Sequence, residues 1–333
     1  MPTRIRIERV DPFTLASRGA YDDATTGGSI TWDASDEGRV SGSLPFLGEL
    51  PGRGDMLRVL REDDAGAIRP LATCFWRYDG RLGAGAQAGE LSLISPLVAL
   101  SGALTDAPYV IAAGARSQQV IEDICRRAWR PLTIASTTGD ARYEVPVVYD
   151  VGTPLSKIAQ DAAAAAGLIV SVDEWGFVTL VDQAAAASWS WTDMPGAGSI
   201  LGRIDRSTSF FDSPTAVIAS WGDSDESVSA TATLSGERSA QALGRRIESR
   251  IDVQGAAGAS YPALLGIAER QLAALDVTET WKFATEFTEA RIHERATITS
   301  TADGATMSGV IQHIEMSLDG LTSCSIQVAG VVM

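Results

Sequence analysis

The chain has 333 residues, 45% of them hydrophobic, which is enough for two or three folded domains and too apolar for a disordered protein. Its 42 acidic and 27 basic residues give a formal net charge of -15, which argues against a surface that grips nucleic acid, because phosphate binding needs clustered cations. The longest uncharged apolar run, about 15 residues at 91–105, is interrupted by proline and glycine and cannot span a bilayer as a helix.

The N-terminal sequence MPTRIRIERV alternates charged and apolar residues and lacks the apolar segment of a secretory signal. Three cysteines, Cys74, Cys125 and Cys324, lie far apart and form no CxxC pair. They predict isolated thiols, not a disulfide framework or a zinc site, which is compatible with assembly in a reducing cytoplasm.

Residues 1–105 are predicted to form a β-domain. Segment 29–46 contains two strand-like runs separated by the turn-like sequence DASDEG, and segments 56–63, 70–80 and 89–100 follow. Short strands at this spacing, with the glycine-rich connection RLGAGAQAG, are typical of an antiparallel meander or a tube-like barrel.

Residues 106–190 are predicted to form a small α+β insert domain. Its first helix, near 117–128, has Ser117 as the predicted N-cap. The apolar stripe of this helix comprises Val120, Ile121, Ile124, Cys125 and Ala128.

The second helix of the insert begins at Thr153, the predicted N-cap, and Pro154, and it ends at Gly167. A hairpin at 168–182 follows, in which Gly176 of the turn EWG is free to take a positive φ. One face of the helix is slim and close-packing, and it comprises Leu155, Ile158, Ala159, Ala162 and Ala166.

Residues 191–333 return to strands and are predicted to form a second antiparallel tube-like barrel. Strands are expected at 215–222, 227–234, 244–253, 281–290, 294–301, 308–318 and 322–332. One helix interrupts them at 261–275, with a face made of Leu264, Leu265, Ala268, Leu272 and Leu275. The predicted fold class is therefore mainly β (α+β), with two barrels separated by the insert.

The sequence contains few residues in arrangements typical of catalysis, metal binding or cofactor binding. His293 and His313, its two histidines, both lie in strand-like runs without a cysteine or a second histidine nearby, so packed residues are favoured over a metal ligand or general base. Gly83, Gly85 and Gly89 nearly spell a dinucleotide-binding loop, but the spacing is one residue too long and no helix follows.

A calcium loop is suggested at 223–234 by Asp223, Asp225 and Ser227. However, Val228 stands where the loop glycine belongs, and Leu234 stands where the bidentate glutamate belongs. A solvated acidic turn is the expected structure.

Paired carboxylates of a glycosidase are conceivable in two acidic stretches. These are Asp22 with Asp23, and Glu62 with Asp63 and Asp64. Ordinary acidic turns are far commoner and are the favoured interpretation. No catalytic residue, cofactor or metal ion is therefore expected, and the chain is predicted not to be an enzyme.

The tripeptide RGD, Arg53 to Asp55, resembles an adhesion motif but is expected to form a turn between strands. Of the tryptophans, Trp189 and Trp191 are the best candidates for an exposed interface, because they alternate with serine. The remaining tryptophans are scattered, so packing is favoured over a sugar-binding platform, and they are Trp32, Trp76, Trp129, Trp175, Trp221 and Trp281.

The order of these segments resembles the tail hub (baseplate hub or minor tail) proteins of tailed bacteriophages, which are related to late-control protein D and to the N-terminal part of VgrG. The resemblance is one of organisation and covers nearly the whole chain. It is carried by a strand leading into a helix at 90–129, the helix and hairpin at 153–182, a returning strand at 213–223, a helix at 260–275 and a final hairpin at 307–330.

The resemblance implies a structural protein of the virion tail tip, assembled in the host cytoplasm. Three chains would form a ring in which six barrels imitate a six-fold tail tube. The ring would line a channel through which genomic DNA passes without specific binding. Ala162, Ala164 and Ala166 of the insert, together with the tryptophan pair, are possible contacts between neighbours.

The resemblance also implies partners: other copies of the chain, the distal tail protein ring, the tape measure protein, and tip or receptor-binding fibre proteins. Larger hubs carry peptidase or fibre modules after this core. Because this chain ends at Met333, no lytic activity is expected, and a non-contractile tail is favoured. Two alternatives stay open, a virion-associated glycan hydrolase and a carbohydrate-binding module that uses exposed tryptophans.

Overall fold

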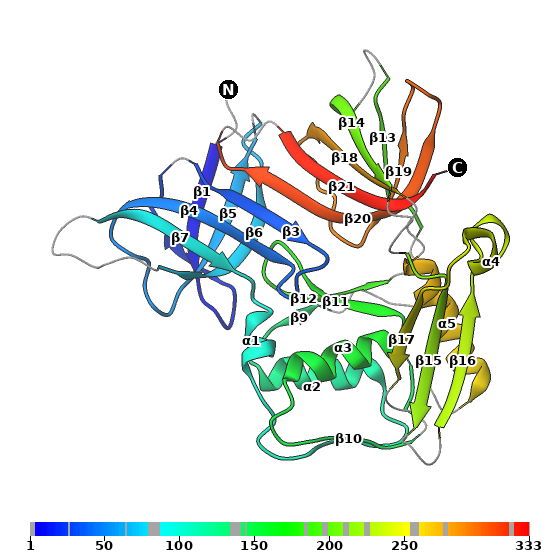
Figure 1. Ribbon diagram of the computed structural model, residues 1–333. Helices are drawn as coiled ribbons and strands as arrows, with labels where there is room; N and C mark the ends of the chain where they lie inside the picture. The colour runs from blue at the N-terminus through cyan, green and yellow to red at the C-terminus, as the bar shows by residue number, and fades with distance from the viewer. Residues whose placement is uncertain are drawn as a thin grey trace.

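The computed structural model describes residues 4–25, 27–63, 65–78, 87–133, 141–143, 145–182, 186–194, 199–208, 213–222, 227–253, 260–275, 279–319 and 323–332. Strands dominate the fold, and the longer helices lie in the middle of the chain and near residue 270 (Figure 1). The predicted mainly β class is therefore confirmed, and most strand pairs are antiparallel.

The first region of the chain consists of strands connected by short turns. Alternation of apolar and polar residues gives most of them one buried and one accessible face. The strands are β1 (Arg4–Val10), β2 (Ser17–Ala20), β3 (Ser29–Asp33), β4 (Val40–Gly48), β5 (Met56–Glu62), β6 (Ile68–Arg77) and β7 (Gln87–Ile94).

Strands from the end of the chain join the same sheet. They are β13 (Trp189–Thr192), β14 (Ile200–Thr208), β18 (Glu279–Glu286), β19 (Arg295–Thr299), β20 (Thr306–Ser317) and β21 (Ser323–Val332). The strand order is β14-β18-β21-β20-β3-β4-β7-β6-β5-β1-β2, with β19 pairing β13 and β20.

Among the described residues, one strand pair joins the two β regions: β20 with β3, in register from His313 opposite Asp33 to Ser317 opposite Ser29. The length of β20 makes this possible, because its 12 residues pair with β19 near the start and with β3 near the end. Among the described residues the strand order is open, and neither region closes into a barrel within one chain. The two separate barrels expected from the sequence are therefore replaced by one continuous sheet.

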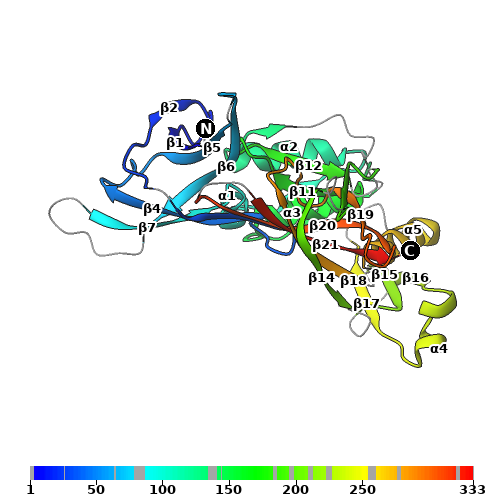
Figure 2. The same ribbon diagram turned by 90° about the horizontal axis from the view of Figure 1, so that it is seen from above.

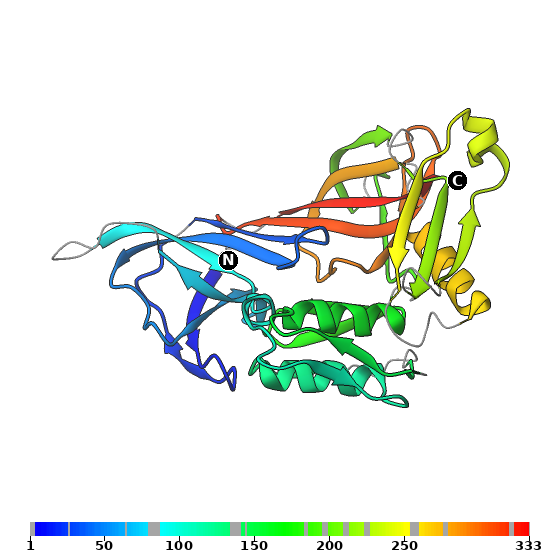
Figure 3. The same cartoon turned by 60° about the horizontal axis from the view of Figure 1, so that its bottom comes forward.

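The insert lies against one side of this sheet (Figure 3). Helices α2 and α3 pack on each other, and α3 also packs on β11. The elements are α1 (Val98–Gly102), β8 (Tyr109–Ile111), α2 (Ser117–Arg127), β9 (Leu132–Thr133), β10 (Val147–Tyr149), α3 (Leu155–Ala165), β11 (Leu168–Val172) and β12 (Val178–Asp182).

The helix starts differ by one residue from the sequence prediction. Helix α2 is capped by Arg116, whose amide donates to Gln119 Oε1 at 3.4 Å, so Ser117 lies inside the first turn. Helix α3 is capped by Pro154. Gly167 ends α3 with a φ of +72°, and Gly176 turns the hairpin with a φ of +94°, as predicted.

A separate small unit interrupts the second β region, which the sequence pattern did not reveal. Its sheet has the order β16-β15-β17, and it lies at the opposite end of the molecule from β1 and β2 (Figure 2). Helix α5 packs against β15 and β16, and Leu264, Ala268 and Leu272 share a core with the sheet. The elements are β15 (Ala216–Gly222), β16 (Ser227–Thr233), η1 (Gly236–Arg238), α4 (Ala240–Leu243), β17 (Glu248–Asp252) and α5 (Tyr261–Leu275).

Within the described part of the chain, no helix has both the length and the apolarity needed to cross a bilayer.

Candidate functional site

One face of the large sheet is lined by small hydroxyl side chains from both ends of the chain. Ser92, Ser43, Ser29 and Ser317 stand in line across β7, β4, β3 and β20. Residues between them along the strands, such as Ile30 and Leu44, point the other way into the core and are at most 1% exposed. The alternation therefore separates an apolar packing face from a polar face.

Two further rows run parallel to the serine row. The first contains Ser41, Thr31, Glu315, Ser325 and Ala284. The second contains Asp33, His313, Gln327, Lys282 and Asp205. Lys282 is the single lysine or arginine in the two further rows, and Arg77 of β6 stands opposite Ser92 at the end of the serine row. The other side chains named in the rows are neutral or acidic, so this face offers little that would hold a polyanion.

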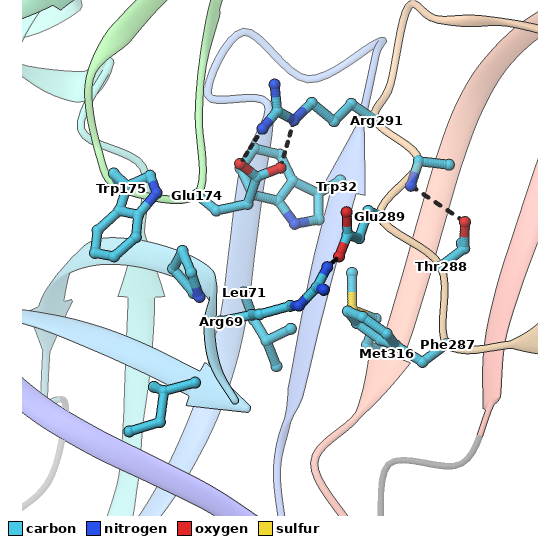
Figure 4. Close-up of a pocket in the computed structure, with 13 residues that line it drawn as sticks. Trp32, Arg69, Leu71, Glu174, Trp175, Phe287, Thr288, Glu289, Arg291 and Met316 are labelled. Atoms are coloured by element: carbon cyan, nitrogen blue, oxygen red, sulfur yellow. Dashed lines mark hydrogen bonds and ion pairs between the residues drawn. The ribbon is translucent and has the colours of Figure 1, made fainter. Parts of the chain in front are cut away.

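The apolar side of the sheet is braced by the turn of the β11–β12 hairpin. Glu174 accepts two hydrogen bonds from the Arg291 guanidinium, at 2.6 and 2.7 Å (Figure 4). Its backbone carbonyl accepts a hydrogen bond from Thr73 Oγ1 at 2.8 Å. Beneath it, the Arg58 guanidinium lies 4.8 Å from the centroid of the Trp175 ring. This turn therefore ties the insert to both β regions.

Arg58 is buried at this junction and contacts several elements there. It is 4% exposed, pairs with Glu8 at 2.7 Å, and donates to Thr73 Oγ1 and to the Leu15 carbonyl at 3.0 and 2.8 Å. A buried guanidinium is stable here because carboxylate and carbonyl oxygens satisfy it.

A pocket of about 300 Å³ opens beside this turn, lined by aromatic and apolar side chains that include Trp32, Leu71 and Phe287 (Figure 4). Its carboxylates are already engaged, Glu174 by Arg291 and Glu289 by Arg69. A glycosidase needs one protonated and one free carboxylate. The arrangement suits a packed junction better than a hydrolytic centre.

The two histidines lie at the seam between the β regions. His313 Nδ1 is 3.1 Å from Asp33 Oδ2. His293 is 9% exposed, has a φ of +68°, and its Nε2 has no hydrogen-bond partner among the described residues. Burial, reinforced by the charge of Arg39, lowers the pKa of His293 to about 4. Within the described ranges, metal-ligating side chains do not gather in groups of three.

The other candidate residues do not converge. Asp23 accepts from the Glu49 amide at 3.2 Å, and Glu62 pairs with Arg6 at 2.6 Å. Asp63 accepts two amides of its own turn at 2.9 Å. Asp22 lies in the same turn as Asp23, distant in the chain from the other acidic stretch. Asp64, Gly83, Gly85, Asp223 and Asp225 lie outside the described residues.

The RGD tripeptide is held in a turn, as expected. Its Asp55 carboxylate pairs with Arg18 at 2.6 Å and is 10% exposed, and Arg18 also donates to the Gly54 carbonyl at 3.1 Å. The aspartate is therefore occupied within the chain.

The tryptophan pair is packed within the chain. Trp189 and Trp191 stack with centroids 5.9 Å apart, and Trp191 is 4% exposed against Phe283. Trp189 is half-buried and donates through Nε1 to Glu294. The exposed interface expected here is therefore not found at Trp191, because strand β13 turns it inward against β18.

The alanine face of α3 is divided by the helical period. Ala162 is fully buried against the chain's own core, whereas Ala164 is exposed and Ala166 is half-buried. A contact with a neighbour therefore remains a prediction for Ala164 and Ala166, and Ala162 is already covered.

Trp129 and Phe13 form an exposed aromatic pair that the sequence did not predict. Trp129 is 71% exposed and Phe13 is 58% exposed, and their ring centroids are 6.1 Å apart. The backbone of Trp129 has a φ of +52°, which is rare for a bulky residue and has no signal in sequence. Buried Arg130 bonds the carbonyls of Pro12 and Trp129 and fixes the pair.

Comparison with protein-family models and with curated proteins finds no match in sequence. Solved structures do match over nearly the whole chain. A tail protein from Neisseria meningitidis has 12% identity and a TM-score of 0.66, covering 99% of this chain and 97% of that one. The prophage MuSo2 43 kDa tail protein from Shewanella oneidensis has 11% identity and a TM-score of 0.66, covering 97% of each chain.

The E. coli c3393 protein, a component of the type VI secretion system with structural similarity to the T4 tail proteins gp27 and gp5, has 10% identity and a TM-score of 0.53. The match covers 93% of this chain and 74% of that one. The fold resemblance predicted from the order of segments is thus confirmed, and it joins phage tail proteins to secretion-system components.

Proposed function

We propose that this chain is a structural hub protein of a phage tail tip, without enzymatic activity. The fold shared with tail proteins supports this role. The observation that carries it is the polar face of the sheet, on which the serine row Ser92, Ser43, Ser29 and Ser317 crosses the join between both β regions.

The proposed assembly is a homotrimer. Each chain contributes two β regions side by side, within predicted boundaries of 1–105 and 191–333, so three chains place six around one axis. Each open sheet closes its tube-like wall against neighbours, and the insert at 106–190 faces outward. Head-to-tail contacts between non-identical edges close into a ring where the rotation between neighbours closes, which for three chains is about 120° per step.

The polar face would line the DNA channel. Hydroxyl and amide side chains bind water well and phosphate weakly, and Lys282 and Arg77 alone, among side chains that are otherwise neutral or acidic, give little attraction for DNA. Genomic DNA would therefore slide past without specific binding. In this position the hub would join the distal tail protein ring and the tape measure protein to tip or fibre proteins.

Electron microscopy of the assembled tail tests the proposal directly. The expected result is a three-fold ring of this chain in which six β regions surround the channel, with the serine row facing the lumen. A single copy, or six copies with one β region each in the tube wall, would contradict it. So would an outward-facing serine row.

A further inference from the structure

Strands β8 and β10 form a two-stranded ribbon that covers the helices of the insert. The Tyr109 hydroxyl donates to Asp123 of α2 at 3.0 Å, and the Tyr149 hydroxyl donates to Asp161 of α3 at 3.0 Å. Helices α2 and α3 lie between β10 and the large sheet (Figure 1). One face of the ribbon is therefore packed on the insert, and the other faces away from the large sheet.

The outer face of this ribbon is apolar. Val110 and Val148 stand directly opposite each other and are 59% and 58% exposed. Leu104 and Val151, on the segments that continue the two strands, are 57% and 60% exposed. These four side chains are called the ribbon face. Exposed aliphatic side chains gathered on one short element mark an interaction surface.

The aromatic pair, Phe13 and Trp129, is a second exposed apolar surface. Together with Arg126 and Pro131 it lines a shallow groove of about 500 Å³. The φ of +52° at Trp129 is costly for a bulky residue, and strained residues of this kind cluster at binding sites. Buried Arg130 holds the backbone beneath the rings, so the pair is presented to a partner in one fixed arrangement.

The two surfaces carry opposite charges. Asp106 and Asp150 are exposed and adjoin the ribbon face in the sequence. Arg126 beside the aromatic pair has 74% of its side chain exposed, and its guanidinium lies only loosely, at 3.7 Å, against Asp123. Opposite charges around two apolar surfaces select one partner and one orientation.

We propose that the aromatic pair of one copy packs on the ribbon face of the next copy, with Arg126 facing Asp150. The occupant is a second copy of this chain, because one chain carries both surfaces and their charges are complementary. The surfaces are not identical, so the contact is head-to-tail and repeats around a ring. This inference rests on the proposed trimer and gives the insert a role in holding it together.

Loss of apolar surface tests the contact. Trp129→Asn and Val148→Ser are each expected to raise the dissociation constant of the oligomer about tenfold or more in analytical ultracentrifugation, because buried tryptophan and aliphatic side chains dominate such interfaces. Asparagine is chosen because it tolerates a positive φ. Tyr261→Ser, at a residue of α5 that is 54% exposed, is the matched control and should leave the oligomer unchanged. All three positions are exposed, so the melting temperature should barely move.

Charge reversal tests the orientation. Arg126→Glu and Asp150→Arg are each expected to weaken the oligomer, because like charges then meet, and the double variant is expected to recover most of the affinity. Glu269→Arg and Arg270→Glu make the same changes of charge at exposed positions of α5 and should have no effect.

Cross-linking provides a third measurement. The native thiols Cys74, Cys125 and Cys324 are buried, so introduced cysteines react selectively. Phe13→Cys combined with Val148→Cys is expected to give covalent trimers with a short bis-maleimide, whereas either change alone should leave monomers.

The outcomes separate the contact from the trimer. Trimers by mass that neither respond to these substitutions nor cross-link would overturn the contact and leave the ring intact. A thiol introduced by Val148→Cys that reacts in the purified trimer but is protected in the assembled tail would assign the ribbon face to a different tail protein, which also overturns the contact. A wild-type protein that stays monomeric at every concentration would overturn both.

Discussion

His313 Nδ1 lies 3.1 Å from Asp33 Oδ2, across the β3–β20 strand pair, which joins the beginning of the chain to its end. The two side chains are 24% and 35% exposed, so water screens their interaction. Next to His313, Ile314 is 1% exposed and packs in the shared core. We therefore expect burial of Ile314, and not the exposed Asp33–His313 contact, to hold this strand pair together.

Asp33→Asn is expected to change the free energy of unfolding by less than about 1 kcal/mol, as for exposed ion pairs. Ile314→Ala is expected to cost about 2–5 kcal/mol, because it removes buried methyl groups and leaves a cavity. Chemical denaturation of both variants at neutral pH measures the difference. A larger loss from Asp33→Asn would show that the seam is held by charge and not by burial.

The pH dependence of stability should report His293. Its folded pKa of about 4 lies below its ordinary value of 6.5, so the unfolded chain binds the proton more tightly. The stabilising effect of the neutral ring is therefore complete above pH 6.5 and is lost as the pH falls towards 4. The shift corresponds to a loss on the order of 3 kcal/mol across this window.

His293→Asn is the matching variant, because asparagine tolerates a φ of +68° better than most residues and does not titrate. Its stability should fall less steeply between pH 6.5 and 4 than that of the wild type. Identical slopes in thermal denaturation would assign the acid sensitivity to other groups.

Two glycines face each other in the β20–β21 strand pair, and there is little room for a side chain at either position. Gly309 and Gly330 lie opposite each other, and a Cβ on Gly330 would stand 2.2 Å from the Ser308 carbonyl oxygen. Gly330→Ala is therefore expected to destabilise the protein by about 1–3 kcal/mol through overpacking.

Gly266→Ala in α5 is the control, since its Cβ meets only the end of Arg270 at 3.6 Å. That change should stabilise by about 0.5–1 kcal/mol. A melting temperature that moves equally in both variants would contradict the close approach.

The sequence predicted individual helices and strands better than it predicted which strands pair. Hydrophobic period and turn residues placed α3, α5 and the β20–β21 hairpin close to their observed bounds. Nothing in those periods says that β20 pairs with β3, because strand pairing across the whole chain depends on tertiary packing. The separate sheet of β15, β16 and β17 was missed for the same reason.

The candidate site shows a similar division. The alternation of Ser29, Thr31 and Asp33 with apolar residues was visible in the sequence, but its alignment with Ser317 required the register. Trp191 was misjudged because its alternation with serine does not say which face is covered. Alternation along a strand predicts which residues share a face, but only the packing of other elements determines whether that face is exposed to solvent.

The junction beneath the sheet should matter for stability and not for turnover. Glu174→Gln removes the charge that pairs with Arg291 while keeping the side-chain shape. We expect a lower melting temperature and no hydrolysis of cell-wall or capsular polysaccharide by either wild type or variant. Robust turnover that Glu174→Gln or Glu289→Gln abolishes would refute the structural role and restore the glycan hydrolase.

The exposed alanine of α3 separates folding from assembly. Ala164 points away from the chain's own core, so Ala164→Trp should leave the melting temperature nearly unchanged. If a tail neighbour covers this face, the bulky ring will block incorporation into particles while the purified trimer persists. Normal incorporation would remove α3 from the contact surfaces. Ala162→Trp is the contrasting variant and should fail to fold, because Ala162 is fully buried.

The polar wall makes a prediction about DNA. Wild-type protein should not retain duplex DNA in gel-shift assays at about 0.15 M salt, where charges act over about 8 Å. Ser43→Arg combined with Ser325→Arg adds cations to two rows of the wall, on β4 and β21. In a closed trimer these would form a ring of six added charges, one pair from each chain. We expect measurable, salt-sensitive retention of DNA and slower DNA release from particles that carry the variant.

Thr231→Arg with Ser229→Arg, on exposed positions of the separate strand β16, adds the same charge away from the wall and should have neither effect. Equal DNA retention by both double variants would show that net charge, and not position on the wall, governs the passage of DNA.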